Sequence, residues 1–174
     1  LSMTTVRNEL LADLRRDEGL VLNAYPDPLS PLAKACARMG FKGDQYRRVK
    51  NWQGLSGTPW TIGFGHTGAD VSPGAVWTLE KCNEILRQDA EKHSADVIRA
   101  FPWVARLDPV RQDVLFNMGF NMGCAGLSKF VNTLKMIETG DYERAAVGMI
   151  NSLWARQVGA RATRLAKMMR TGVR

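Results

Sequence analysis

The sequence predicts a mostly helical α+β fold, in which a small antiparallel sheet near the N-terminus is followed by a helical bundle. Two observations carry this prediction. Apolar residues recur at helical spacing through most of the chain beyond residue 78, whereas residues 20–27 and 58–66 combine β-forming residues with proline and glycine. A chain of 174 residues buries roughly two-thirds of its unfolded surface, so it does not need disulfides to fold.

The first helix is expected over residues 5–18. Its apolar residues recur every three or four positions with charged residues between them, and Gly19 is a natural C-terminal stop. The strands of the small sheet are expected next, at residues 20–27 and 58–66, where β-forming residues meet turn-forming residues.

The segment between these strands, residues 28–59, carries helix signals of its own. Ser30 and Pro31 suit the cap and first position of a helix, and Gly40 suits its end. A second short helix is expected from Asp44. The segment holds six basic residues against one acidic residue, a net charge of +5, whereas the whole chain carries +7.

Beyond residue 78 the pattern is continuously helical. Asp108 and Pro109 suit the opening of one helix, and further helices are expected near residues 129–138, 142–151 and 160–170. Gly140 ends one helix and Asp141 caps the next, so short loops should join the members of a compact bundle.

Composition bounds the class of protein. The three cysteines, Cys36, Cys82 and Cys124, are widely and irregularly spaced, which favours reduced thiols over a disulfide framework or a zinc site, and we expect no metal or cofactor. No stretch approaches the ~20 apolar residues of a membrane span, and the first residues lack the apolar run of a secretion signal, so synthesis in the cytoplasm is expected. The positive charge favours a polyanionic partner.

Two carboxylates are candidates for catalysis: Glu18, at the end of the first helix, and Asp27, at a turn nine residues later. Hydrolysis of a glycosidic bond needs one protonated acid and a second group that activates water or stabilises the positively charged sugar. Charged residues are usually solvated surface residues, so the pair alone is a weak indication.

Three short motifs follow one another in order: Asp17-Glu18-Gly19-Leu20, Tyr25-Pro26-Asp27 and Thr61-Ile62-Gly63-Phe64-Gly65-His66. They resemble the hallmark of glycoside hydrolase family 24, the T-even phage lysozyme family. Similar segments continue to Gly172, so the resemblance covers nearly the whole chain except residues 28–59.

The resemblance implies a two-lobed phage lysozyme fold with a cleft between the lobes, formed by a single domain over residues 1–174. The N-terminal lobe would span about residues 15–75 and include the sheet. A long linking helix would lead to the C-terminal helical lobe, about residues 78–174, which would also take in the first helix.

The resemblance also implies roles for residues. Glu18 would be the general acid, while Asp27 and Thr61 would position or activate water, with inversion at the sugar carbon. The other expected site residues are His66, Thr67, Phe120 and Thr133 on the substrate side and Arg161 beside the acid. Thr61 is otherwise an ordinary strand residue, Phe120 a core residue, and Arg161 a solvated helix residue. A metal-binding role for His66 is disfavoured, since no ligand cluster accompanies it.

The implied function is that of an endolysin. It would hydrolyse the β-1,4 bond between N-acetylmuramic acid and N-acetylglucosamine in bacterial peptidoglycan, as a monomer, after release from the host cytoplasm through a separate membrane-permeabilising protein. The alternatives are a lysozyme on a phage tail, a lytic transglycosylase, a module that binds peptidoglycan without cutting it, and a cationic envelope, membrane or nucleic-acid binder. No nucleic-acid-binding motif is present, so no specific nucleic acid is expected.

Residues 28–59 depart from the family, which usually joins these two strands by a few residues, so we treat them as an insertion beside the expected site. The basic residues of the insertion are Lys34, Arg38, Lys42, Arg47, Arg48 and Lys50. With Tyr46 and Trp52 as aromatic handles, they suggest contact with anionic envelope polymers. The simpler interpretation is a solvated helical pair over a small local core. The insertion could also separate Asp27 from Thr61 or cap the cleft as a lid.

Overall fold

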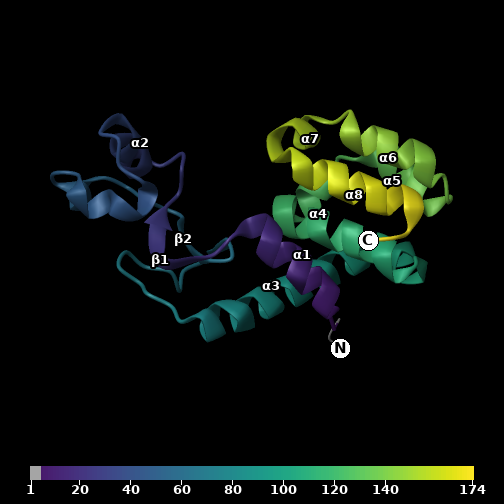
Figure 1. Ribbon diagram of the computed structural model, residues 1–174, viewed down its shortest axis with the longest axis horizontal. Helices are drawn as coiled ribbons and strands as arrows, with labels where there is room; N and C mark the ends of the chain where they lie inside the picture. Colours follow the sequence, from purple (N-terminus) through teal and green to yellow (C-terminus); the bar gives the residue numbers. More distant parts are fainter. Residues whose placement is uncertain (1–4) are drawn as a thin grey trace. The chain divides into compact units, whose positions relative to one another are not determined.

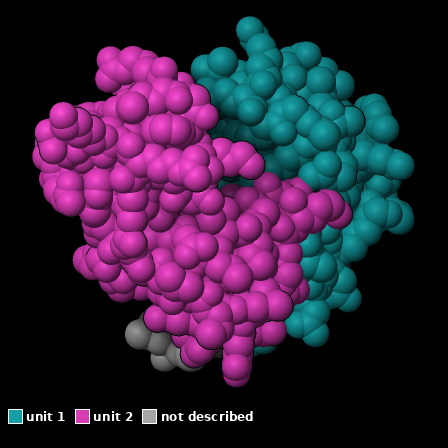
Figure 2. Space-filling model, turned by 60° about the vertical axis from the view of Figure 1, so that its left-hand side comes forward, with its two compact units in different colours: residues 1–13, 89–174 teal, residues 14–88 magenta. Residues whose placement is uncertain are grey.

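The computed structural model describes residues 5–174 and forms two compact units (Figure 2). One unit, Leu14–Gln88, contains the sheet and is called the sheet unit below. The other, called the helical unit, combines Asp89–Arg174 with the residues up to Asp13. Each of the two boundaries between the units falls within a helix. The boundary after Asp13 lies in α1 (Asn8–Glu18), and the boundary after Gln88 lies in α3 (Leu79–Ala100). Helix α1 begins three residues later than the sequence predicted.

The sheet has three antiparallel strands in the order β1-β2-β3, as the sequence predicted for its first two. The strands are β1 (Val21–Pro26), β2 (Trp60–Gly63) and β3 (His66–Thr67). Tyr25 pairs with Thr61, and Thr61 pairs with Thr67. Directly paired residues project to the same face of a sheet, so these three side chains share one face.

The insertion folds as its local signals indicate, beside strands β1 and β2 (Figure 1). Helix α2 (Pro31–Arg38) starts at Ser30, whose side chain accepts a hydrogen bond from the Ala33 N–H at 3.1 Å. The second expected helix is a 3-10 turn, η1 (Gly43–Arg48), and a further 3-10 turn, η2, spans Trp52–Gly54. The short helix expected from Asp44 is therefore present, in 3-10 rather than α geometry, and it ends after six residues.

Tyr46 forms the centre of a small aromatic core in the insertion. It is 3 % exposed and packs edge-to-face against Trp52 and against Trp60 of β2, with ring centroids 4.9 and 4.8 Å apart. The expectation that Tyr46 is an aromatic handle for a ligand was therefore wrong. Its ring attaches the insertion to the sheet, and edge-to-face pairs contribute about 0.5–1.5 kcal/mol beyond burial.

The helical unit is a bundle that follows the second half of α3. Its helices are α4 (Pro109–Leu127), α5 (Val131–Glu138), α6 (Tyr142–Ile150), α7 (Leu153–Val158) and α8 (Ala160–Thr171), preceded by the 3-10 turn η3 (Pro102–Arg106). The predicted caps are present: Asp108 accepts from the Arg111 N–H and Asp141 from the Arg144 N–H. Helix α7 was not predicted, because six residues are too few to show a periodic pattern.

The cysteines are free thiols, as expected, and burial raises the pKa of both Cys36 and Cys82. Within residues 5–174, no helix is both long and apolar enough to cross a membrane. The same part of the chain holds no group of three His, Cys, Asp or Glu residues that could bind a metal ion.

Candidate active site

Glu18 ends α1, and its carboxylate lies against the turn between β2 and β3. A Cβ atom placed on Gly65 of that turn would lie 3.1 Å from Glu18 Oε2. The backbone of Gly65 also has a φ of +77°, which L-residues rarely adopt. The backbone conformation thus favours glycine at this position, and a larger residue there would press on the half-buried Glu18 carboxylate.

Tyr25 brings the three expected catalytic residues together. Burial raises the pKa of its phenol most, and the negative charge of Glu18 raises it further. A side-chain hydrogen bond with Thr61 opposes this shift, and the charge of Asp27 adds a smaller increase. Glu18, Asp27 and Thr61 therefore all act on one phenol within the sheet unit, and strand register places Tyr25 opposite Thr61. In the sequence Tyr25 stands out only as part of a motif, and its position opposite Thr61 emerges from the strand register.

Asp27 is held at the first turn after β1. Its backbone N–H donates to the carbonyls of Gly57 and Pro59, at 2.9 and 3.1 Å, and its Oδ1 accepts from the Leu29 N–H at 2.8 Å. Because residues 57 and 59 lie at the far end of the insertion, these bonds close it at its base. The insertion therefore does not separate Asp27 from the strand that carries Thr61.

The His66 ring contacts two neighbours in the sheet unit, Asp70 and Trp77. Its Nε2 lies 3.1 Å from Asp70 Oδ1, and its ring lies 5.4 Å from that of Trp77. The hydrogen bond with His66 lowers the pKa of Asp70 below its ordinary value, mostly by stabilising the carboxylate. Thr67, the next residue, is exposed and lies across from Thr61.

The structure places the other expected site residues in the helical unit. Arg161 is 7 % exposed and donates from Nε to Asn117 Oδ1 at 2.9 Å, so its interpretation as a solvated helix arginine was wrong. Thr133 is also 7 % exposed, and a Cβ on Gly148 of α6 would lie 2.6 Å from its hydroxyl. Phe120 is partly exposed, with its ring 5.4 Å from that of His93.

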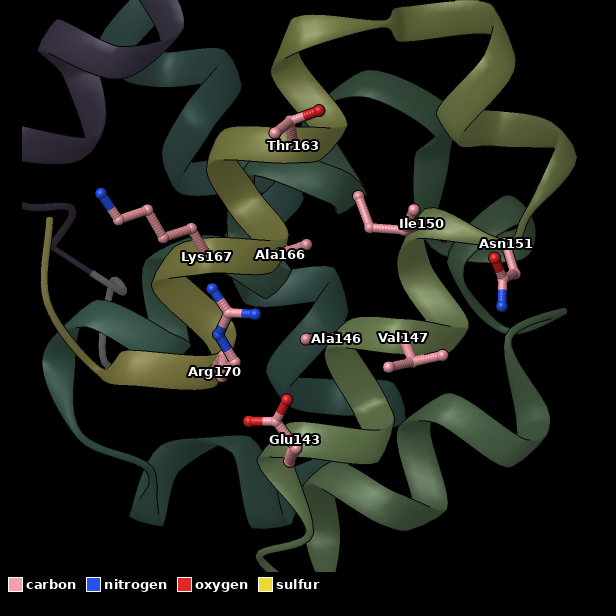
Figure 3. Close-up of a pocket in the computed structure, with 9 residues that line it drawn as sticks. All are labelled: Glu143, Ala146, Val147, Ile150, Asn151, Thr163, Ala166, Lys167 and Arg170. Atoms are coloured by element: carbon pink, nitrogen blue, oxygen red, sulfur yellow. The ribbon is translucent and has the colours of Figure 1, made fainter.

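A separate cavity of about 300 Å³ lies between α6 and α8 (Figure 3). Aliphatic side chains of α6 line its middle, and Lys167 and Arg170 of α8 stand toward one side with Glu143. This cavity has one carboxylate among its lining residues, whereas glycoside hydrolysis by acid and base needs two. The sheet-unit cluster is therefore the better candidate for catalysis.

Comparison with known proteins decides the family. The sequence model of the phage lysozyme family matches residues 38–170. This chain belongs to the phage lysozyme family. The sequence-based family assignment and its mostly helical α+β fold are thereby confirmed. The family match starts inside the insertion, so it does not cover Glu18 and Asp27.

The relatives of this family member come from phages and from a eukaryote. The pre-baseplate central spike protein Gp5 of Enterobacteria phage T4 is 30 % identical over 171 residues, which cover 91 % of this chain and 27 % of that protein. The probable T4-type lysozyme 2 of Dictyostelium discoideum is 39 % identical over 66 residues, or 38 % of this chain and 39 % of its own length. A SAR-endolysin of Bacteriophage PS119 is 28 % identical over 108 residues, or 61 % and 59 %. The chain thus spans less than two-thirds of each of these relatives.

Proposed function

We propose that this member of the phage lysozyme family is a muramidase that hydrolyses the β-1,4 bond between N-acetylmuramic acid and N-acetylglucosamine in peptidoglycan. The observation that carries the proposal is the gathering of Glu18, Asp27 and Thr61 around Tyr25 in the sheet unit. Two carboxylates and a hydroxyl at one place supply the groups that acid-assisted hydrolysis by water requires.

In this proposal the residues divide the work between the two faces of the sugar. Glu18, held against Gly65, donates a proton to the leaving glycosidic oxygen. Asp27, oriented by the Leu29 N–H, and the Thr61 hydroxyl position a water molecule for attack at the sugar carbon. Attack from the face opposite the leaving group inverts the configuration of that carbon.

Substrate contacts are part of the same proposal. The exposed Thr67 is well placed on the face of the sheet that it shares with Thr61. The His66 ring is held by Asp70 and Trp77, which favours a role in positioning the neighbouring strand and turn. In the helical unit, partial exposure makes Phe120 the better candidate for contact with a saccharide, whereas the burial of Thr133 favours packing.

The deciding experiment compares Glu18→Gln with Glu9→Gln, which removes an exposed carboxylate from the same helix. Both variants and the wild-type protein are incubated with purified peptidoglycan, and the released fragments are analysed by mass spectrometry. Glu18→Gln should release fragments about 10²–10⁴ times more slowly, as expected for loss of a general acid, while Glu9→Gln should match wild type. Anhydro products would instead indicate a transglycosylase, and wild-type rates in Glu18→Gln would reject the proposed acid.

The similarity to a spike protein favours a second setting for the same chemistry. A segment of Gp5 aligns with 91 % of this chain, so a lysozyme carried on the virion is a specific alternative to a free endolysin. Quantitative mass spectrometry of purified virions separates the two settings. A fixed number of copies per particle indicates the tail-associated lysozyme, and absence from particles indicates the free endolysin released during lysis.

A further inference from the structure

The insertion presents a concentration of unpaired positive charge. Its basic side chains are all exposed: Lys34, Arg38, Lys42, Arg47, Arg48 and Lys50. Within residues 5–174, none of these six forms an ion pair. Elsewhere, arginines commonly face carboxylates, as in the pairs Arg7–Asp113 and Arg111–Asp108. The charge of the insertion is thus not used to hold the fold together by ion pairs.

Two of the six cations pack against the insertion itself. Arg47 Nε donates to the Tyr46 hydroxyl at 3.3 Å, and its guanidinium lies beside Gly74. Arg48 lies over the ring of Phe41, 5.8 Å from its centroid. The other four, Lys34, Arg38, Lys42 and Lys50, have charged groups that meet no partner among the described residues. These four are the candidates for contact with a ligand.

Helix α2 carries two of these cations and is flanked by exposed apolar residues. Lys34 and Arg38 are four residues apart and therefore lie on one side of the helix, whereas its buried residues are Leu32, Ala35 and Cys36. Leu29, just before the helix, is 78 % exposed, and Met39, just after it, is 52 % exposed. Cations alone suit any polyanion, but cations flanked by exposed apolar side chains suit a surface with phosphates above acyl chains.

We propose that the insertion is a docking surface for phosphate-bearing lipid. The four unpaired cations bind the lipid phosphates, and Leu29 and Met39 enter the boundary between headgroups and acyl chains. The phosphate groups of an anionic phospholipid provide this chemistry at the boundary that Leu29 and Met39 would enter. The lipid is a partner separate from the glycan, so the inference holds whether or not Glu18 is a catalytic acid.

The test measures co-sedimentation of the full chain with vesicles. Three kinds are used: phosphatidylcholine alone, phosphatidylcholine with phosphatidylglycerol, and phosphatidylcholine with lipopolysaccharide. The charge variant is Lys34→Gln/Arg38→Gln/Lys42→Gln/Lys50→Gln. Its matched control removes four exposed cations from the helical unit: Arg106→Gln/Arg156→Gln/Lys167→Gln/Arg170→Gln. Circular dichroism checks that both variants remain folded.

The wild-type chain should bind anionic vesicles and not phosphatidylcholine alone. The charge variant should bind about fivefold more weakly for each cation that reaches the surface, whereas the control should stay within about twofold of wild type. Binding to the phosphatidylglycerol vesicles supports the assignment to phospholipid, whereas binding only to the lipopolysaccharide vesicles would overturn it. Absence of binding to both, undiminished binding by the charge variant, or an equal loss in the control would overturn the proposal.

A second pair of variants separates lipid from a soluble polyanion. Leu29→Ser/Met39→Ser removes the exposed apolar groups, and Val131→Ser/Leu153→Ser does the same at exposed positions of the helical unit. The first pair should weaken vesicle binding, most visibly at high salt where electrostatic attraction is screened, and the second should not. If Leu29→Ser/Met39→Ser binds vesicles as wild type does, and duplex DNA competes fully, the insertion is a general polyanion site and the lipid proposal is wrong.

Discussion

Replacement of Gly65 by alanine should damage catalysis more than stability. The residue sits at a φ of +77°, a region that costs an L-residue about 1–2 kcal/mol. For a domain of this size, each kcal/mol lowers Tm by about 2–4 °C. The new methyl group would also lie 3.1 Å from Glu18 Oε2, so the carboxylate must move by a few tenths of an ångström. Misplacement of a reacting group by about 1 Å can cost about 10²-fold, so we expect a loss of roughly tenfold in kcat.

Gly40 offers a matched control. Its φ is +73°, and nothing lies within 4 Å of a Cβ placed on it. Gly40→Ala should therefore lose a similar amount of stability in thermal unfolding but keep the wild-type rate of peptidoglycan cleavage. A wild-type rate in Gly65→Ala, or an equal loss of rate in Gly40→Ala, would refute the reasoning that the turn positions the Glu18 carboxylate.

Three further predictions follow from the sheet unit. Glu18→Gln should lower the pKa of Tyr25, because the negative charge of Glu18 raises it. NMR titration of labelled tyrosines measures this pKa, and an unchanged value would show that Glu18 does not act on Tyr25. Asp70→Asn should lower the free energy of unfolding at pH values above 3.8, the ordinary pKa of an aspartate, but not at pH values well below it. The reason is that a carboxylate with a lowered pKa stabilises the fold only while it is ionised, and this contribution is lost as the pH falls through the folded-state pKa. Urea unfolding from pH 2 to 6 checks this, and a pH-independent difference would contradict it. Ser30→Ala should cost about 1 kcal/mol of unfolding free energy through loss of the α2 cap, whereas exposed Ser56→Ala should cost less.

Much of the secondary structure follows from short-range signals. Ser30, Asp108 and Asp141 each cap a helix where the sequence predicted one, because a cap depends only on residues within one turn. The family motifs likewise depend on adjacent residues. Some short elements escaped this reasoning: helix α7 (Leu153–Val158) and the 3-10 turns η2 and η3 are shorter than the two turns that a periodic pattern needs.

Burial of individual polar and aromatic residues was harder to predict. Tyr46 occurs among charged residues in the sequence, which suggested an exposed position, whereas Arg161 was expected beside the acid or, alternatively, in solvent. In the structure Tyr46 packs between two tryptophans, and Arg161 hydrogen-bonds Asn117, which lies 44 residues earlier in the chain. Such partners come from distant segments, and a local pattern does not identify them.

The sequence by itself determined the family, the helical character of the chain and the identity of its candidate catalytic residues, since these depend on motifs and spacing. Only the tertiary structure decided that Asp27 and Thr61 stay together around Tyr25 despite the insertion between them. It also decided that, among the described residues, none of the six basic side chains of the insertion forms an ion pair. The physical reason is that strand register and ion pairing join residues far apart in the chain, and their geometry exists only once the backbone has folded.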